Sequence, residues 1–254
     1  MTIEIDQLTV TATGPEGVTP LLRGVSACLE ARTTAIIGEN GSGKSTLAKV
    51  IGGLLSPASG TVTVNGLDVV RDAKRLRRDT GFIIANAAAQ IIMPTVREDV
   101  ALTLRSRSLN RRELEDQVDA ALAEHGLTEL ADRSCLSLSS GQLQRLALCS
   151  VLVGKPDVVI ADEPSSMLDA RHQRLVSRRL FSQPADAQLV LVSHDLDLVR
   201  RCEETVWIHQ GQVAGHGSSS AVVESYLNML DETEAESTAD FEGTTQMTPP
   251  KGRP

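Results

Sequence analysis

A glycine-rich segment of the chain could bind phosphate groups, because it fits the pattern G-x-x-x-x-G-K-[ST]. It follows a β-branched apolar run, Thr33–Ile37, and precedes a stretch with helical spacing, Ser45–Leu55. Glycines let successive backbone N–H groups turn toward phosphate oxygens, and the N-terminus of the following helix adds partial positive charge. A glycine-rich turn that only opens a helix is the alternative, but the order strand, loop, helix favours a nucleotide site. We expect nucleotide contacts from Gly38, Glu39, Asn40, Gly41, Ser42, Gly43, Lys44, Ser45 and Thr46.

Two carboxylates follow a second apolar run and have the chemistry of a hydrolytic site. Val158–Ala161 predicts a buried strand, so Asp162 and Glu163 should emerge together at the carboxyl edge of a sheet, where ligands bind. Asp162 and the Ser45 hydroxyl would then bind Mg²⁺, and Lys44 would reach the outer phosphates. Glu163 would orient and deprotonate the attacking water. A solvated acidic turn is the alternative, and the phosphate-binding segment upstream makes it the weaker one.

His194 follows a further apolar run, Leu189–Ser193, and should emerge at the same edge of the sheet. A lone histidine is more often structural than catalytic, but this position, with Asp195 beside it, favours a contact to the γ-phosphate. The remaining histidines lack such a context, and we interpret them as surface or packing residues: His125, His172, His209 and His216.

The spacing of apolar residues predicts an α/β fold that positions these groups. Two alternating stretches on either side of a Gly-Pro turn, Ile3–Val10 and Leu21–Leu29, predict an antiparallel pair of strands at the N-terminus. From about residue 99 to about residue 150 the helical spacing predicts a helical insert in the α/β pattern. Further predicted elements are a strand at Thr61–Val64, a helix near Ala170–Phe181, a strand at Leu189–Val192 and a hairpin around Gln210 and Gly211.

The C-terminal segment differs in composition from the rest of the chain. From Asp231 it is acidic and poor in large apolar residues, so it cannot bury enough surface to offset its chain entropy. We therefore expect one domain over residues 1–230 and a disordered tail over residues 231–254.

The composition of the chain narrows the class of protein. Of 254 residues, 41% are hydrophobic and 23% charged, and no apolar run is long enough to span a bilayer. The N-terminus lacks a secretory signal pattern, which predicts a cytosolic protein. The net charge of −8 argues against nucleic acid as a partner. The four cysteines are dispersed without a C-x-x-C pair, which argues against metal or redox chemistry at cysteine residues.

The segment Leu138–Gln142, followed by Leu-Gln-Arg, closely resembles the LSGGQ signature of the ABC ATPase family, with Ser140 where the family usually has glycine. By itself the segment could be only a helix N-cap. Its position 20 residues before Asp162 agrees with ABC cassettes, and the resemblance covers about residues 1–230. It implies a phosphate-loop parallel sheet, an N-terminal antiparallel β-subdomain and a helical signature subdomain. It also implies that two chains enclose two ATP molecules, with contacts from Ser139, Ser140, Gly141 and Gln142.

Two further segments, Pro164–Asp169 and Pro94–Ala101, resemble the ATPases of energy-coupling factor importers. This resemblance implies an ATP hydrolase that lies at the cytoplasmic face of the cell membrane. Its expected partners are a second ABC ATPase subunit, identical or different, a transmembrane coupling protein and a substrate-binding membrane protein. Such importers take up vitamins or the metals cobalt and nickel, and the sequence does not specify which one this chain serves.

The sequence departs from the family at two positions. The glutamine that usually contacts Mg²⁺ and the lytic water corresponds here to Ala85, so we expect slow turnover. Gln90 matches a second glutamine of the importer pattern and is the candidate metal contact that remains in this segment. An aromatic residue that stacks on adenine in many members corresponds to about Ala12, so we expect weak discrimination between bases.

Two other functions compete with a transport ATPase. A degenerate cassette would bind ATP and regulate a partner with little turnover; Ala85 favours it, whereas Glu163 and His194 oppose it. A non-transport ABC protein that acts on nucleic acid or ribosomes is disfavoured by the single cassette and the acidic charge.

Overall fold

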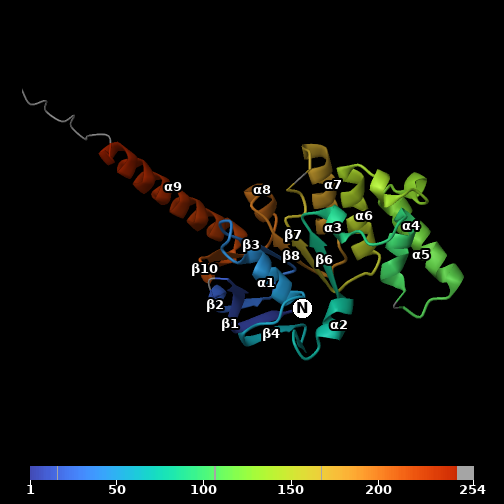
Figure 1. Ribbon diagram of the computed structural model, residues 1–254, viewed down its shortest axis with the longest axis horizontal. Helices are drawn as coiled ribbons and strands as arrows, with labels where there is room; N and C mark the ends of the chain where they lie inside the picture. The colour runs from blue at the N-terminus through green and yellow to red at the C-terminus, as the bar shows by residue number, and fades with distance from the viewer. Residues whose placement is uncertain (16, 106, 167, 245–254) are drawn as a thin grey trace, which may run out of the picture.

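The computed structural model describes residues 1–15, 17–105, 107–166 and 168–244. In these residues two β-sheets lie side by side, a group of helices extends from one side of them, and the long C-terminal helix leaves the other side (Figure 1). The α/β fold class predicted from the sequence is therefore confirmed, with both the antiparallel and the helical subdomain present.

The smaller sheet is antiparallel and contains the two predicted N-terminal strands. Its strand order is β2-β1-β4-β5, and the long hairpin of β1 and β2 runs in register from Ile3 opposite Leu29 to Gly14 opposite Gly17. The bounds are β1 Ile3–Gly14, β2 Gly17–Leu29, β4 Ser59–Val64 and β5 Leu67–Asp68.

The larger sheet has the order β10-β9-β3-β8-β7-β6, and all of its pairs are parallel except the hairpin of β9 and β10. Every residue of β3, β7 and β8 is buried, as their continuous apolar runs predicted. The edge strand β6 is not predicted from the sequence. The bounds are β3 Thr33–Ile37, β6 Thr80–Ile84, β7 Val158–Asp162, β8 Gln188–Val192, β9 Glu204–His209 and β10 Gln212–Ser218.

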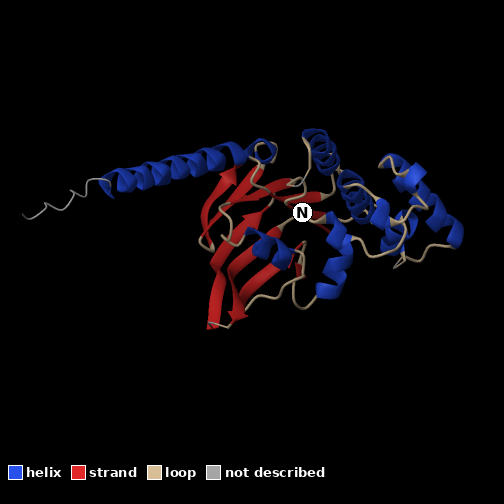
Figure 2. Ribbon diagram, turned by 45° about the horizontal axis from the view of Figure 1, so that its top comes forward, coloured by secondary structure: helices blue, strands red, loops and turns tan. Residues whose placement is uncertain are grey.

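The helices divide into those that flank the sheets and those of a helical subdomain, which lies on the side of the strands away from the C-terminal helix (Figure 2). The flanking helices are α1 Lys44–Ile51, α2 Ala73–Asp79, α7 Ala170–Phe181 and α8 Leu196–Val199. The helices of the subdomain are α3 Ala87–Gln90, α4 Val96–Leu104, α5 Arg111–Glu124 and α6 Ser140–Leu152, with short 3-10 turns at Thr128–Leu130 and Cys135–Ser137. These helices occupy the segment of the predicted insert, about residues 99–150, and the first of them begins earlier, at Ala87.

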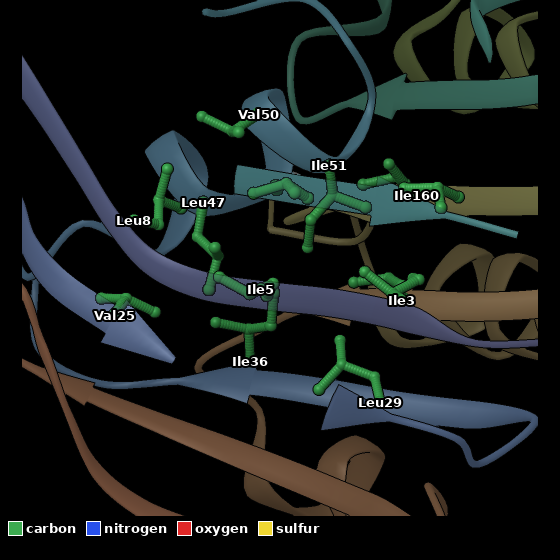
Figure 3. Close-up of a cluster of buried hydrophobic side chains, with 14 of the residues drawn as sticks. Ile3, Ile5, Leu8, Val25, Leu29, Ile36, Leu47, Val50, Ile51 and Ile160 are labelled. Carbon is green, nitrogen blue, oxygen red and sulfur yellow. The ribbon is translucent and has the colours of Figure 1, made fainter. Parts of the chain in front are cut away.

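Three apolar clusters hold these layers together. The first lies between α1, the antiparallel sheet and one face of the parallel sheet, where Leu47 and Ile51 of α1 pack near Ile5 and Ile36 (Figure 3). The second lies on the opposite face of the parallel sheet, under α7 and the start of the C-terminal helix. The third belongs to the helical subdomain, so this subdomain has a core of its own.

The C-terminal helix α9, Ser219–Thr244, differs from the disordered tail expected from Asp231 onward. Its first turns bury Val222 and Val223 in the second cluster, and the rest projects away from the body (Figures 1 and 2). The composition of residues 231–244 disfavours burial, but alanine and glutamate are good helix formers, and a helix needs no core to satisfy its backbone. Residues 245–254 lie outside the described residues, and the domain boundary at residue 230 stays a prediction. No helix among the described residues is both long and apolar enough to cross a membrane.

Candidate nucleotide site and signature turn

The predicted phosphate-binding segment is a loop between β3 and α1, as its pattern requires. Gly38 and Gly43 both have positive φ, 142° and 109°. A Cβ on Gly38 would lie 2.0 Å from the carbonyl oxygen of Ile208, and one on Gly43 would lie 2.6 Å from Leu22. The loop therefore runs so close to the neighbouring backbone that only glycine fits at these two positions.

The loop is open to a ligand on its inner side. No side chain caps the N-terminus of α1 in the described part of the chain, which leaves backbone N–H groups for an anion. The Ser42 hydroxyl is buried and has no hydrogen-bond partner among the described residues. Glu39, Asn40 and Gly41 are exposed, whereas Ser45 and Thr46 lie half-buried in the first turn of α1.

Lys44 is buried, and its ammonium group donates hydrogen bonds to the carbonyl oxygens of Gly38 and Glu39, each at 2.8 Å. Burial lowers the pKa of the Lys44 side chain, while the charges of Glu163, Asp162 and Glu39 act in the opposite direction. Since the backbone carbonyls compensate this cation only in part, phosphate oxygens would be stronger acceptors for it.

Ser45 and Asp162 meet although they lie far apart in the sequence. The Ser45 Oγ donates a hydrogen bond of 2.9 Å to Oδ1 of Asp162, which ends β7. Both side chains present hard oxygen donors, which suit Mg²⁺. Within the described ranges no group of three or more His, Cys, Asp or Glu residues could hold a metal ion. Mg²⁺ would therefore need oxygens from phosphate and water in addition to this pair.

Glu163 and His194 form a second pair beside the first. Glu163 has a φ of 51°, an uncommon conformation for a residue other than glycine, and such strain is often found at functional sites. Its Oε2 lies 2.8 Å from Nδ1 of His194, and its backbone N–H donates to the carbonyl oxygen of Val192. The sheet edge thus brings together the predicted metal-binding, hydrolytic and γ-phosphate-contacting side chains.

Gln90 lies in a different position from the one expected of a metal contact. Its Oε1 accepts a hydrogen bond from the Ile84 backbone N–H, and its Nε2 donates to the Phe82 carbonyl oxygen, both at 3.1 Å. The side chain thus stabilises the connection from β6 to α3, and Ala85 lies within that connection. A metal contact by Gln90 stays a prediction, and it would require these bonds to break.

The signature turn, residues 139–142, forms the N-terminus of α6 in the helical subdomain. The Ser139 Oγ accepts a hydrogen bond from the Gln142 backbone N–H, and Gln142 Oε1 accepts one from the Ser139 N–H. This capping box leaves Ser139 and Ser140 exposed, whereas Gly141 is buried. No hydrogen bond in the described part of the chain joins the turn to the phosphate-binding loop of the same molecule.

The sequence patterns missed contacts that support this site. Gln144 donates a buried hydrogen bond of 2.8 Å to the carbonyl oxygen of Pro164, just after Glu163. His209 Nδ1 lies 3.5 Å from Glu39 Oε2, and the Gly211 N–H donates to the Ser42 carbonyl oxygen, so the β9–β10 hairpin holds the phosphate-binding loop. Among the supporting contacts, the N-cap of α7 by Asp169 is one that the sequence could have predicted, because Asp is common at the position before a helix.

Comparisons with known proteins agree with this geometry. Residues 22–166 match the family described as ABC transporter. The chain is 38% identical over 210 residues to the biotin transport ATP-binding protein BioM of Rhizobium etli, covering 83% of this chain and 92% of BioM. It is 34% identical to the energy-coupling factor transporter ATP-binding protein EcfA1 of Enterococcus faecalis, covering 82% of this chain and 76% of EcfA1.

Solved structures give the same result. The structure of cbiO1 from Clostridium perfringens, part of the ABC transporter complex cbiONQ, is 29% identical with a TM-score of 0.75, covering 87% of this chain and 90% of cbiO1. The dimeric ATP-binding cassette MJ0796 in a post-hydrolysis state, bound to ADP and Pi, is 26% identical with a TM-score of 0.77. That match covers 85% of this chain and 98% of MJ0796.

Proposed function

Because this chain belongs to the ABC transporter family, as its ATP-hydrolysing subunit, we propose that it energises an importer of the energy-coupling factor type. The cargo would be a vitamin or a transition-metal ion, carried by a separate membrane complex. The named relatives BioM and EcfA1 support this subgroup. We place the chain at the cytoplasmic face of the membrane, with a transmembrane coupling protein and a substrate-binding membrane protein as its partners.

The observation that carries the proposal is the hydrogen bond between Ser45 and Asp162, 2.9 Å long, beside the pair of Glu163 and His194. Four side chains, from the ends of strands β7 and β8 and from helix α1, are thus already assembled for phosphoryl transfer. This reaction asks the protein mainly to position groups and to stabilise charge.

Each residue then has a distinct role in hydrolysis. The backbone N–H groups of the loop Gly38–Ser45 bind the phosphates, and Lys44 exchanges its carbonyl partners for phosphate oxygens. Ser45 and Asp162 would hold Mg²⁺, which neutralises charge on the outer phosphates when bound. Glu163 orients the attacking water and accepts its proton, while His194 contacts the γ-phosphate.

The exposed signature turn supports a dimer. Ser139 and Ser140 are exposed at the N-terminus of a 13-residue helix, which attracts anions. In our proposal this turn covers ATP bound to a second subunit, identical or homologous, so two chains enclose two nucleotides.

A degenerate regulatory cassette is the second candidate, and Ala85 is the observation that favours it. The two candidates differ in turnover. The full chain, purified with its membrane partners, is assayed for phosphate release beside a Glu163→Gln variant. A transport ATPase releases phosphate at a rate that the variant abolishes while it still binds ATP, and it dimerises when loaded with Mg-ATP. Release near background from both proteins, with ATP still bound, would favour the regulatory cassette.

The cargo needs its own measurement. Vesicles containing the complete complex are loaded with Mg-ATP and offered labelled biotin, cobalt or nickel in parallel. Accumulation of one of them that Glu163→Gln abolishes would identify the cargo. Failure of all three, with hydrolysis intact, would refute these cargoes but leave the ATPase assignment in place.

A further inference from the structure

The imidazole ring of His172 fills the space beside Gly141 in the signature turn. A Cβ on Gly141 would lie 2.4 Å from His172 Nε2 and 2.5 Å from Cδ2, far inside contact distance. Gly141 has no positive φ, so glycine is needed here for space and not for backbone conformation. Helices α6 and α7, which pack side by side, therefore meet through one rigid ring at the first turn of α6 (Figure 1).

The other side of the same ring is held by Asp169, the N-cap of α7. His172 Nδ1 lies 2.9 Å from Asp169 Oδ2, and the His172 backbone N–H donates to Oδ1, also at 2.9 Å. The backbone N–H and the ring of His172 are the main reasons why the pKa of Asp169 is lowered. The carboxylate thus fixes both the start of α7 and the orientation of the imidazole, with Nε2 directed at Gly141.

Asp169 belongs to the connection that begins at Glu163, and α6 and α7 hold this connection at further points. Gln144 of α6 donates to the Pro164 carbonyl oxygen at 2.8 Å, and Gln173 of α7 donates to that of Ser165 at 3.3 Å. The Ser166 hydroxyl donates to the carbonyl oxygen of Glu163 itself at 3.2 Å. A shift of α6 relative to α7 would therefore be transmitted to the backbone of Glu163.

We propose that His172 is a positioning residue, which couples the signature turn of its own chain to the Glu163 carboxylate through the start of α7. The inference rests on the proposed function, since it concerns the hydrolysis carried out by Glu163. When ATP on the second subunit binds at the N-terminus of α6, Gly141 presses on the imidazole because no soft side chain lies between them. The ring passes this displacement to Asp169, and the connection that follows Glu163 adjusts with it.

A double-mutant cycle on Gly141 and His172 tests this coupling. The wild-type chain, Gly141→Ala, His172→Ala and the double variant are purified as full chains with their membrane partners. For each protein kcat and KM for ATP are measured, together with the midpoint of thermal unfolding. Arg171→Ala is the matched control, because Arg171 is exposed on the same turn of α7 and its side chain makes no hydrogen bond among the described residues.

We expect His172→Ala to lower kcat about tenfold with KM changed less than about twofold, since a small misplacement of a reacting group is costly. Gly141→Ala should lower kcat in the wild-type background, where the new methyl group meets the ring. In the His172→Ala background it should lower kcat much less, because the space is then open. Arg171→Ala should keep the wild-type kcat.

Two results would overturn this inference and leave the proposed function in place. One is a lowered unfolding midpoint of His172→Ala with kcat unchanged, which is the signature of a packing residue. The other is a Gly141→Ala effect of the same factor in both backgrounds, which would mean that Gly141 acts only by touching the nucleotide. A second variant, His172→Asn, covers the case that His172→Ala folds poorly. It keeps a hydrogen bond to Asp169 but lacks the ring beside Gly141, and it should show the same loss of kcat. An inert wild-type complex would instead refute the proposed function.

Discussion

Nδ1 of His194 lies 2.8 Å from Oε2 of Glu163, and the two residues follow the neighbouring strands β8 and β7. The side chain of His194 is 69% exposed, whereas that of Glu163 is 22% exposed. The histidine therefore lies at the open side of the site, in contact with the carboxylate that we propose to act on water. In the proposed mechanism, this position would let one side chain both orient Glu163 and reach an incoming γ-phosphate.

Replacement of His194 by alanine should lower kcat about a hundredfold, because a positioned acid–base partner contributes at least that much. ATP binding should change little, since the phosphate-binding loop and Lys44 are untouched. Steady-state phosphate release and a nucleotide titration measure the two effects separately.

The control for this variant is His216→Ala. His216 Nε2 lies 2.7 Å from Glu204 Oε1, so it is a histidine–carboxylate pair of the same kind away from the nucleotide site. It should keep the wild-type kcat, and equal losses in both variants would contradict a specific role for His194.

The substitution Ala85→Gln, which restores the glutamine that the family usually has at this position, should raise kcat several-fold. Ala85 follows β6 at the same edge of the sheet, and a glutamine there could contact the metal and the lytic water, as the family pattern implies. Ala88→Gln adds the same side chain at an exposed position of α3 and should leave the rate unchanged. A steady-state assay in which Ala85→Gln is no faster than wild type would speak against slow turnover caused by Ala85.

The strands and loops that carry the nucleotide site were predictable because their signals are local. The run Thr33–Ile37 and helix α7, Ala170–Phe181, have the predicted bounds, since an apolar run, a cap and glycine act within a few residues. The antiparallel pairing of β1 and β2 was likewise predictable from the glycine- and proline-containing turn between them.

The contacts that bring distant elements together were not predictable in the same way. His172 and Gly141 lie on different helices, and only the packing of α6 on α7 reveals that one occupies the space beside the other. The helix α9 was missed for a different reason. A low content of large apolar residues indicates that a segment is not buried, but a helix that projects into solvent depends on the helix propensity of its residues. Gln90 has a side chain suited to a metal contact, but its amide group forms hydrogen bonds with the backbone of β6 instead.

GTP should compete with ATP more effectively than in cassettes with an aromatic base platform. Ala12 is exposed on β1, opposite Thr19 of β2, and no aromatic residue occurs before Phe82. Ala12→Tyr should strengthen ATP binding by about 1–3 kcal/mol if this strand faces the base. Thr13→Tyr, on the opposite face of the strand, is the control. Competition titrations that show a strong preference of the wild type for ATP would refute the prediction.

The helical subdomain should depend on one buried carboxylate, that of Asp99. Its Oδ1 accepts hydrogen bonds from the backbone N–H groups of Ile92 and Met93, and its Oδ2 accepts one from the Ser150 hydroxyl at 2.7 Å. Asp99→Ala leaves these donors without their acceptor, which should cost about 3 kcal/mol of unfolding free energy. Asp119→Ala removes an exposed partner of Arg97 and should cost less than about 1 kcal/mol. Urea unfolding of both variants decides, and equal losses would contradict the prediction.

Acid should destabilise the protein partly through His125. Its Nδ1 bonds to the Ala121 carbonyl oxygen at 3.0 Å, and burial lowers its pKa below the ordinary value. The unfolded chain therefore takes up this proton at a higher pH than the folded one. The resulting stability is complete above about pH 6.5 and is lost as the pH falls through the lowered pKa of the folded state.

The test compares unfolding free energies at about pH 7.5 and about pH 5.5. His125→Gln should reduce the loss between the two conditions, because it removes the group that takes up the proton. Leu122→Ala is the matched control: it creates a cavity one turn away on α5 and lowers stability at both pH values, but it keeps the buried imidazole and should keep the wild-type loss. Nε2 of His125 has no hydrogen-bond partner among the described residues, so nothing there stabilises an added proton in the folded state. If His125→Gln nevertheless loses as much stability as the wild type between the two pH values, another group must account for the acid sensitivity.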